Sequence, residues 1–393
     1  MTDKIYRHDG YIFDFEAHVI SVEGDDVILD CTAFYPGGGG QVCDTGMIRD
    51  CRVTEVFYNK DGDIVHKTPK NNLKVGEIVW CEVDWDRRYG LMQGHTGEHL
   101  LFGSLQRQCD ELNIVKIFIS PETKYVIVDR DLTWEQIRAA EEFANKAIAD
   151  NLSVTHSIMD RDDPELEKVR IKMEKIDEDE EITVVAIGDI DYSACSGVHV
   201  LETSELGMLI VDRKVKAGKE GYEIHFKVGE DAKKSALALS NIALETIDVI
   251  GCKNEDTPKA VFNMKQELEL KNKLLKDATK QIVKNLRPED VNGVEVYSAI
   301  LPGADRNVMN DTMESIRSKG GVAAFVSVAE TLSVMLASGN DKVDCKKIFA
   351  DVLTLFGGRG GGKPNFAQGG VPDVAKADEV LKSLVDAVKG ALN

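Results

Sequence analysis

At residues 91–102 the chain reads Leu-Met-Gln-Gly-His-Thr-Gly-Glu-His-Leu-Leu-Phe, and the hydrophobic pattern changes where this stretch begins. Five side chains recur on one face at helical spacing: Leu91, His95, His99, Phe102 and Gln106. The spacing predicts a helix over about residues 87–109, because residues three and four apart are neighbours on a helix surface. The two histidines of this helix therefore lie one turn apart on the same side.

The residues before this helix form short alternating runs separated by turn residues. One hairpin is predicted over residues 16–29, and a second is centred on Asp61-Gly62, a dipeptide typical of tight hairpin turns. Residues 78–83 alternate in the same way and are predicted to form a further strand. Short strands with frequent turns predict a small β-barrel or sandwich as the first domain.

After the helix, strands and helices follow one another without strict alternation. Predicted strands at residues 125–128 and 182–187 are separated by a predicted helix at residues 133–148, which begins with a capping box. Such a mixture favours an α+β fold. The predicted order of domains is a β-barrel (1–88), an α+β domain (89–228), a long helical hairpin (229–288) and a small α/β domain (289–393).

Composition limits the possible functions. The 393 residues include 48 Lys and Arg against 68 Asp and Glu, a formal net charge of −20. This balance argues against a nonspecific nucleic-acid coat but permits a local basic surface. No run approaches the roughly 18 uncharged apolar residues of a membrane-spanning helix, so we expect no membrane partner. The first residues lack a secretory apolar segment, which predicts a cytoplasmic protein whose eight cysteines are thiols or metal ligands.

Two separated pairs of side chains form a candidate metal site. His95 and His99 have a spacing that lets both reach one ion, and Cys195 and His199 follow a predicted strand. Three imidazoles and one thiolate suit tetrahedral zinc. The alternative is two buried histidines, a buried cysteine and a surface histidine without metal. Four tight ligands would make a closed structural site, whereas hydrolysis needs one open position, which we expect at His199.

Glu98 allows a second interpretation of the same helix. Residues 95–99 have the His-x-x-Glu-His order of inverzincin proteases, in which the glutamate is the general base. Such proteases take a downstream carboxylate as the third metal ligand, so this interpretation competes with the assignment of Cys195 and His199. The simpler alternative is that Glu98 is a solvated carboxylate or one that only supports the metal ligands.

A four-glycine run joins the end of a predicted strand to the next segment. Its members are Gly37, Gly38, Gly39 and Gly40. Because glycine lacks a Cβ atom, a ligand can approach such a backbone closely, although a flexible loop is the simpler alternative. Thr32 and Gln41 flank the run and offer a hydroxyl and an amide suited to binding a small polar substrate.

A second glycine-rich stretch, residues 357–364, nearly matches the phosphate-binding loop of nucleotide triphosphatases. Pro364 stands where the magnesium-binding hydroxyl must be, so we expect ATP-independent activity. A glycine-rich loop carrying Arg359 and Lys363 can still hold the phosphates of a nucleic acid. Arg87 and Arg88 are further basic points, for which ordinary solvated charge is the alternative.

Together these motifs resemble one family, the freestanding alanyl-tRNA editing proteins (AlaX), in the long form related to the editing and C-terminal portions of alanyl-tRNA synthetase. The matching segments are residues 32–41, 83–88, 95–101, 195–200, and 357–364 with 367–370. Two segments depart from the usual family pattern. Pro-Gly-Gly-Gly-Gly-Gln lacks the acidic residue that often follows the proline, and Cys-Ser-Gly-Val-His replaces the commoner Cys-Gly-Gly-Thr-His. These departures leave the amino-acid preference of the pocket open.

The resemblance implies a set of roles for these residues. One zinc ion per chain would be held by His95, His99, Cys195 and His199, in a zinc-dependent editing domain. Thr32 would discriminate the amino acid and Gln41 would be the site glutamine, and both are our candidate catalytic residues. The residues expected to contact tRNA are Gly37, Gly38, Gly39, Gly40, Arg87, Arg88, Arg359 and Lys363.

The implied function is hydrolysis of tRNA(Ala) mischarged chiefly with serine, and also with glycine. A synthetase pocket for alanine cannot strongly reject glycine, because a missing methyl is worth only about 1–3 kcal/mol, so a second hydrolytic site is useful. Two alternatives belong to other classes: a noncatalytic tRNA-binding module and a His-x-x-Glu-His metalloprotease. The C-terminal region is also a candidate for homodimer formation.

Overall fold

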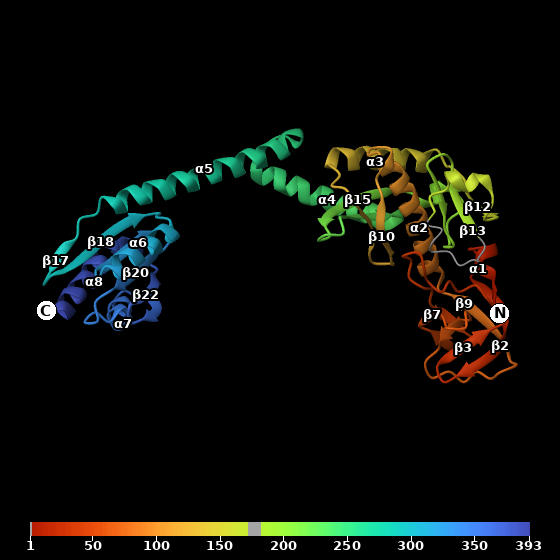
Figure 1. Ribbon diagram of the computed structural model, residues 1–393, viewed down its shortest axis with the longest axis horizontal. Coiled ribbons are helices and arrows are strands. Elements are labelled where there is room, and N and C mark those ends of the chain that lie inside the picture. The colour runs from red at the N-terminus through yellow and green to blue at the C-terminus, as the bar shows by residue number, and fades with distance from the viewer. Residues whose placement is uncertain (1, 172–181) are drawn as a thin grey trace. The chain divides into compact units, whose positions relative to one another are not determined.

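A computed structural model describes residues 2–171 and 182–393 of the chain. The chain divides into two compact units, Met1–Glu245 and Thr246–Asn393 (Figure 1). Both units contain helices and sheets, and the first begins with an all-antiparallel sheet. The expected α+β class is thereby confirmed, whereas the four predicted domain boundaries stay a prediction.

The N-terminal sheet has seven strands in the order β6-β5-β9-β2-β3-β8-β7. Their bounds are β2 Asp14–Glu23, β3 Asp26–Leu29, β5 Gly46–Ile48, β6 Cys51–Val53, β7 Glu55–Tyr58, β8 Ile64–Lys67 and β9 Ile78–Val83. The pairings β2 with β3 and β7 with β8 confirm both predicted hairpins. The short segments beside this sheet are β1 Asp3–Lys4, α1 Ile5–His8 and β4 Cys31–Thr32.

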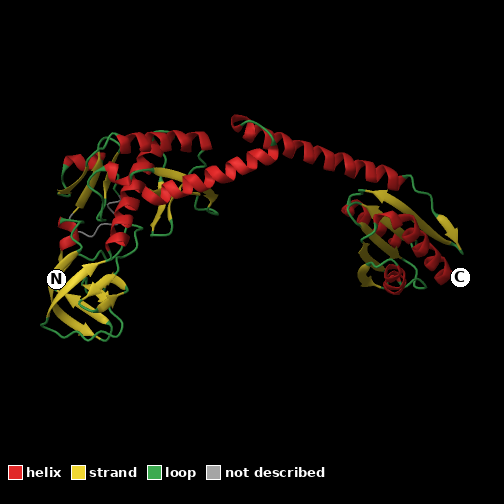
Figure 2. Ribbon diagram, turned by 180° about the vertical axis from the view of Figure 1, so that it is seen from behind, coloured by secondary structure: helices red, strands yellow, loops and turns green. Residues whose placement is uncertain are grey.

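The sheet curls into a nearly closed barrel because of its strand order. Its two edge strands, β6 and β7, are consecutive in the chain and only Thr54 separates them, so the edges must lie near each other. Side chains alternate between inside and outside along the strands, and Phe15, Ala17 and Val19 of β2 are buried. Figure 2 shows these strands gathered around the N-terminus.

A long helix, α2 (Trp85–Gln106), follows the barrel and packs against α3 (Trp134–Ala149). The capping box predicted at the start of α3 is present: Thr133 and Gln136 exchange hydrogen bonds between their side chains and backbone N–H groups. Two further sheets flank α2. The first has four strands in the order β10 Ile114–Ile119, β11 Lys124–Val128, β16 Tyr222–Val228 and β15 Leu209–Lys216. The second has three strands in the order β12 Val154–Met159, β13 Ile182–Ile187 and β14 Asp191–Ala194. Short 3₁₀ turns lie at η1 Pro164–Lys168 and η3 Thr203–Leu206.

The second unit is built on a six-stranded mixed sheet in the order β17-β18-β19-β20-β22-β21. Its strands are β17 Glu289–Val291, β18 Val294–Pro302, β19 Val322–Val328, β20 Leu332–Ser338, β21 Arg359–Lys363 and β22 Phe366–Val371, and its helices are α6 Arg306–Ser318, α7 Cys345–Leu355 and α8 Ala377–Leu392, with a short η5 Val374–Lys376. The parallel pair β18 and β19 is connected through α6. This region therefore combines strands and helices, as expected for an α/β fold.

Helices cover both faces of this second sheet. Along β19, Ala323 and Phe325 belong to a buried cluster with Met309 and Met313 of α6. Alternate positions of the same strand join the other cluster, which contains residues of α7 and α8. Successive side chains of a strand point to opposite faces, so a continuously apolar strand such as β19 must be buried on both sides.

Two long helices connect these sheets, α4 (Gly229–Ile250) and α5 (Thr257–Lys284), with a short turn at η4 (Asn254–Asp256). The predicted break between two helices is confirmed, and their packing as a hairpin stays a prediction. Large apolar side chains on both are exposed, among them Ile242 at 60% and Phe262 at 60%. No single described helix is both long and apolar enough to cross a membrane; only the bent pair at 229–250 and 254–284, taken together, meets that test of length and composition.

Candidate metal and active site

Helix α2 carries the first two metal-binding candidates through the middle of the first unit. His95 and His99 are only 2% and 3% exposed. Two glycines let neighbouring segments approach this helix: a Cβ atom on Gly97 would lie 2.6 Å from Val228 Cγ1, and one on Gly103 would lie 2.4 Å from the Ile190 carbonyl oxygen. A helix with this close packing on several sides holds its histidines in fixed positions.

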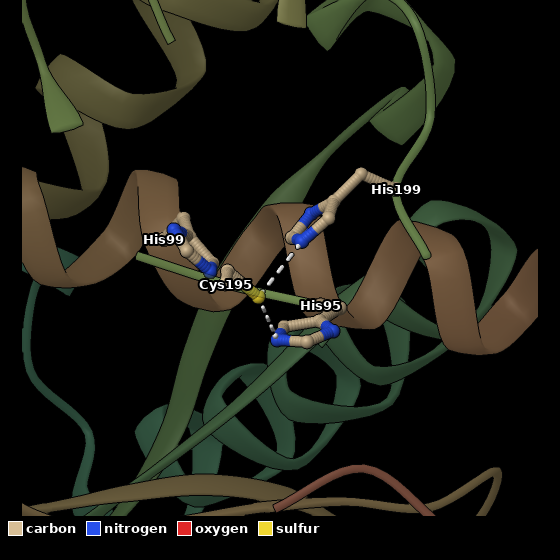
Figure 3. A group of neighbouring side chains, drawn as sticks. All are labelled: His95, His99, Cys195 and His199. Carbon is tan, nitrogen blue, oxygen red and sulfur yellow. Dashed lines mark hydrogen bonds between the residues drawn. The ribbon is translucent and has the colours of Figure 1, made fainter. Parts of the chain in front are cut away.

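The other two candidates come from the loop after β14. Cys195 Sγ lies 3.4 Å from His95 Nε2 and 3.3 Å from His199 Nε2. One donor atom from each of the four residues, His99 included, lies within 4.8 Å of every other (Figure 3). The two motifs, predicted from segments about a hundred residues apart, therefore meet at one point.

The Nδ1 atom of each histidine in the cluster has a hydrogen-bond partner outside the cluster. His95 Nδ1 donates to Gln41 Oε1 at 2.8 Å, and His99 Nδ1 donates to Asp191 at 2.6 Å. His199 Nδ1 lies 3.2 Å from the Thr96 hydroxyl. In the neutral rings of His95 and His99, these acceptors hold the proton on Nδ1 and leave the Nε2 lone pair for the cluster, which is the arrangement seen around metal-bound histidines.

Charges in the cluster also favour ligation. Burial raises the pKa of the Cys195 thiol, but the His95 and His199 imidazoles outweigh this effect and hold that pKa well below its ordinary value. Burial lowers the pKa of His199 to about 3, so this ring is neutral. Burial also lowers the pKa of His99, but the Asp191 and Glu98 carboxylates outweigh this effect and hold that pKa well above its ordinary value, so a metal would displace a proton from His99. A thiolate and neutral imidazoles are the forms in which these side chains bind metals. The donor set therefore fits a metal ion, and the residues that would hold it are the four predicted ones.

A cavity of about 980 Å³ opens beside the cluster. Three of the four donors line it, His95, His99 and Cys195, whereas His199 is not among the lining residues. The other polar lining residues include Tyr35, Glu98, Gln106, Asn113, Lys116, Arg170, Thr183, Ser193 and Ser196. The apolar part of the wall includes Phe102, Leu112, Ile114, Val115, Ile117, Val169, Ile171 and Ile182. A ligand in this cavity would contact three candidate metal ligands on one side.

Comparison with known proteins gives consistent matches along the chain. Residues 9–87 match the family described as tRNA synthetases class II (A), and residues 293–390 match the DHHA1 domain. The alanine–tRNA ligase of Methanoregula boonei is 30% identical over 401 residues, which make up 97% of this chain but 43% of the ligase. The chain thus spans less than half the length of that relative. The C-Ala domain of Aquifex aeolicus alanyl-tRNA synthetase matches 27% of this chain and 98% of its own, at 20% identity and a TM-score of 0.24.

One relative matches from end to end. The alanyl-tRNA editing protein AlaX-L of Pyrococcus horikoshii is 29% identical over 415 residues, which cover 100% of both chains. The chain belongs to the alanyl-tRNA editing family. The resemblance found from the sequence motifs is therefore confirmed, and the two family matches contain the glycine-rich segments 32–41 and 357–370.

Thr32 and Gln41, the predicted catalytic pair of this editing-family chain, have different surroundings. The Thr32 hydroxyl is buried in the barrel, where it donates to His66 Nε2 at 2.8 Å and accepts from the Phe34 N–H at 3.1 Å. It is not among the residues that line the cavity. Gln41 supports the metal ligand His95, and its buried Nε2 has no hydrogen-bond partner in the described structure.

The four-glycine run brings Gln41 to this position in the editing-family chain. Gly37 to Gly40 all have positive φ angles, which other residues adopt only with strain. A Cβ atom on Gly40 would lie 2.5 Å from the Ile117 carbonyl oxygen, and Ile119 donates its N–H to the Gly40 carbonyl at 2.8 Å. The glycines thus join the barrel to β10, and Gly39 and Gly40 line the cavity.

The predicted contact of Arg88 with tRNA is wrong for this member of the editing family. Its guanidinium is fully buried, pairs with Asp44 and donates to the backbone carbonyls of Gly10 and Ala33. Arg87 is half-buried and donates to the Cys43 carbonyl at 2.9 Å. The basic dipeptide therefore fastens the start of α2 to the barrel.

The second glycine-rich stretch of the editing-family chain is not the expected phosphate-binding loop. Residues 359–363 form β21, an edge strand paired with β22, and side chains at Gly360 and Gly362 would collide with that partner strand. A Cβ atom on Gly362 would lie 2.1 Å from the Phe366 carbonyl oxygen. Arg359 and Lys363 are both exposed at this edge, so they stay available for a nucleic-acid backbone.

Sequence reasoning missed several residues around the cluster. Asp191 and Thr96 support the histidines, and Arg170 donates to Asp191 at 2.9 Å. The imidazole of His156 lies edge-on to His199, with ring centroids 5.5 Å apart. Asp191, Arg170 and His156 have no fixed spacing from the metal motifs that could have marked them, whereas Thr96 stands inside the first motif, directly after His95. Glu98 was considered, but it is fully buried in the cavity wall and the solvated alternative is wrong.

Proposed function

We propose that this chain hydrolyses the ester bond of mischarged tRNA(Ala), chiefly seryl-tRNA(Ala) and also glycyl-tRNA(Ala), with the help of one zinc ion. The observation that carries the proposal is the meeting of three imidazoles and one thiol, of which His95, His99 and Cys195 line a cavity. The printed name of the end-to-end relative, an alanyl-tRNA editing protein, supports the substrate class. The Lewis-acid chemistry of zinc supports the reaction class.

Different residues of the chain would bind the metal, bind the substrate and exclude water. His95, His99, Cys195 and His199 would hold the ion, which when bound polarises an ester carbonyl or lowers the pKa of water. The free N–H of Gln41 would bind an oxygen of the substrate, since a buried donor without a partner is destabilising until it is satisfied. The apolar wall around Phe102 would exclude bulk water from the ester.

Two arrangements support hydrolysis over the alternatives. The groups that join His95 and His99 are a thiol and an imidazole, not the downstream carboxylate of an inverzincin protease. A purely tRNA-binding module would have no use for donors that face a cavity. His199 does not line the cavity, so we propose that the substrate approaches the ion from the side of the other three donors.

The first experiment measures release of labelled serine from seryl-tRNA(Ala) by the full chain, beside alanyl-tRNA(Ala) and a zinc assay on the same sample. We expect serine release with alanine spared and one zinc per chain. Cys195→Ala should abolish both metal binding and turnover, whereas Cys252→Ala, at the turn before α5, should change neither. Full turnover by metal-free Cys195→Ala would refute the zinc mechanism, and no release from either tRNA would favour the binding module.

The predicted role of Thr32 in choosing serine is part of this proposal and has its own test. Thr32→Val keeps the side-chain shape and removes the hydroxyl. If that hydroxyl contacts serine, the ratio of seryl- to alanyl-tRNA hydrolysis should fall by about tenfold or more, as expected when a hydrogen bond to substrate is lost. An unchanged ratio would mean that the Thr32 hydroxyl does not contact the substrate and only stabilises the barrel through its hydrogen bond to His66.

We also propose that the exposed edge of β21 contacts the tRNA body. Exchanging Arg359 and Lys363 for Gln should weaken tRNA binding and reduce its salt dependence, because each phosphate contact releases counterions. The same exchange at Lys342 and Lys346, exposed in the same unit, is the control. We further propose a cytoplasmic location, which cell fractionation would test. We also propose that the C-terminal region forms a homodimer, which light scattering of the purified chain would test.

A further inference from the structure

A buried carboxyl group without a hydrogen-bond partner lies in the wall of the cavity. Both oxygens of Glu98 are buried, and neither accepts a hydrogen bond from any residue that the structure describes. Nε2 of His99 is 3.7 Å from Glu98 Oε2, beyond hydrogen-bond distance. Buried polar atoms in proteins are almost always paired. An unpaired carboxyl at a cavity wall therefore points to a donor that comes from a bound ligand.

The position of Glu98 on α2 brings it close to the metal-binding side chains. It lies three residues after His95 and four before Phe102, so all three side chains share one face of the helix. All three line the cavity. A ligand that reaches the candidate metal ligands is therefore within reach of the Glu98 carboxyl as well.

The neighbouring cation is Arg170, whose buried Nε also has no hydrogen-bond partner in the described structure. Arg170 donates to Asp191 at 2.9 Å, and its guanidinium lies 4.8 Å from the centre of the Phe102 ring. It makes no hydrogen bond to Glu98, whose two oxygens are both unpaired. The site thus holds two unpaired carboxyl oxygens, which one ligand group carrying more than one N–H or O–H donor can satisfy together.

We propose that Glu98 binds the α-amino group of the aminoacyl ester, an assignment that rests on the proposed function. An amine presents two or three N–H donors, which match two free carboxyl oxygens, and bonds to a charged partner are stronger than neutral ones. Serine and glycine esters share this amine, so Glu98 selects the class of α-aminoacyl esters without reading the side chain. N-acylated and peptidyl esters lack the charge and are excluded by the same carboxyl.

Two stable ligands test this assignment without relying on turnover. They are adenosine carrying a 3′-amide-linked serine with a free α-amine, and the same compound N-acetylated, each titrated into the zinc-loaded full chain by calorimetry. The free amine should bind roughly ten- to hundredfold more tightly, the loss expected when a charged hydrogen-bond partner is removed. Glu98→Gln should bring the two affinities within about twofold, and Glu142→Gln, exposed on α3, should keep the wild-type ratio.

Each outcome supports or overturns the assignment. Equal binding of both ligands by the wild-type chain refutes it, as does a Glu98→Gln variant that is folded, loaded with zinc and still prefers the free amine. If Glu98→Gln fails to fold or to bind zinc, Glu98→Asp, which keeps the carboxylate, replaces it and should retain the preference in weakened form. A preserved amine preference without hydrolysis of seryl-tRNA would refute the hydrolase and leave the amine site standing. Binding of neither ligand to the folded, zinc-loaded chain overturns the amine assignment, and serine release from seryl-tRNA then decides the proposed function separately.

Discussion

The Asp191 carboxylate accepts a hydrogen bond of 2.6 Å from His99 Nδ1, and both side chains are almost fully buried. Burial raises the pKa of Asp191, but the neighbouring His99 and Arg170 outweigh it and hold that pKa well below its ordinary value. The residue is therefore a carboxylate at all ordinary pH values. Its bond directs the other nitrogen of His99 toward Cys195 and the cavity.

Loss of this carboxylate should weaken metal binding. Asp191→Asn replaces a charged acceptor with a neutral amide, and such partners of metal-bound histidines are typically worth about 10–100-fold in metal affinity. Competition with a chromophoric chelator would measure the change. Asp189→Asn is the matched control, because that carboxylate is 89% exposed and pairs with Arg107 at the surface. Equal zinc affinity of Asp191→Asn and the wild type would contradict the supporting role.

Gly197, between Cys195 and His199, leaves room for the ring of His95. A Cβ atom there would lie 2.2 Å from His95 Cε1 and 2.4 Å from its Nδ1. We therefore expect Gly197→Ala to displace His95, break its bond to Gln41 and lower the zinc content of the purified protein well below one equivalent. Elemental analysis measures this content, and Ser196→Ala, exposed at the neighbouring position, should bind zinc normally. Full zinc occupancy in Gly197→Ala would show that the loop can relax.

Arg88 should matter for stability and not for tRNA affinity. Removing one partner of a buried ion pair typically costs about 3–5 kcal/mol, because the other charge is left uncompensated. Arg88→Gln should therefore destabilise the barrel by this amount in urea unfolding followed by tryptophan fluorescence. Arg52→Gln breaks an exposed pair with Asp84 and should cost about 0–1 kcal/mol. A stable Arg88→Gln variant with weakened tRNA binding would restore the surface role predicted from sequence.

Much of the fold was predictable because its signals are local. The hairpins, the capped start of α3 and the histidine face of α2 each depend on residues within a few positions of one another. The metal pairs were recognised by their own short spacings. Their meeting across a hundred residues followed from the chemistry of the ligand set, not from any contact visible in the sequence.

The parts that sequence could not predict depend on distant partners. Asp44, which neutralises Arg88, is 44 residues away, so the Arg87-Arg88 dipeptide looked like a basic surface. Asp191 gave no signal because its partner His99 lies 92 residues earlier. The strand β21 carries almost no side chains and hence no alternating pattern. It forms because its glycines fit against the backbone of β22.

The last prediction concerns the pH dependence of barrel stability, through His66. This ring is fully buried, with Nδ1 donating to the Val27 carbonyl at 3.2 Å and Nε2 accepting from Thr32. Burial lowers the pKa of His66 from 6.5 to about 4. Below pH 6.5 His66 is protonated in the unfolded chain, whereas in the folded barrel it stays neutral down to about pH 4. The contribution of neutral His66 is therefore complete above pH 6.5 and is lost as the pH falls toward 4.

The loss should amount to roughly 3 kcal/mol over that range, at 1.36 kcal/mol for each unit of pKa difference. Urea unfolding at several pH values between 7 and 4 would measure it as the difference between the wild type and His66→Gln, which cannot titrate. Carboxylates titrate in both proteins, so their effect cancels in this difference. Parallel curves of stability against pH for the wild type and His66→Gln would contradict a lowered pKa of His66 in the folded barrel.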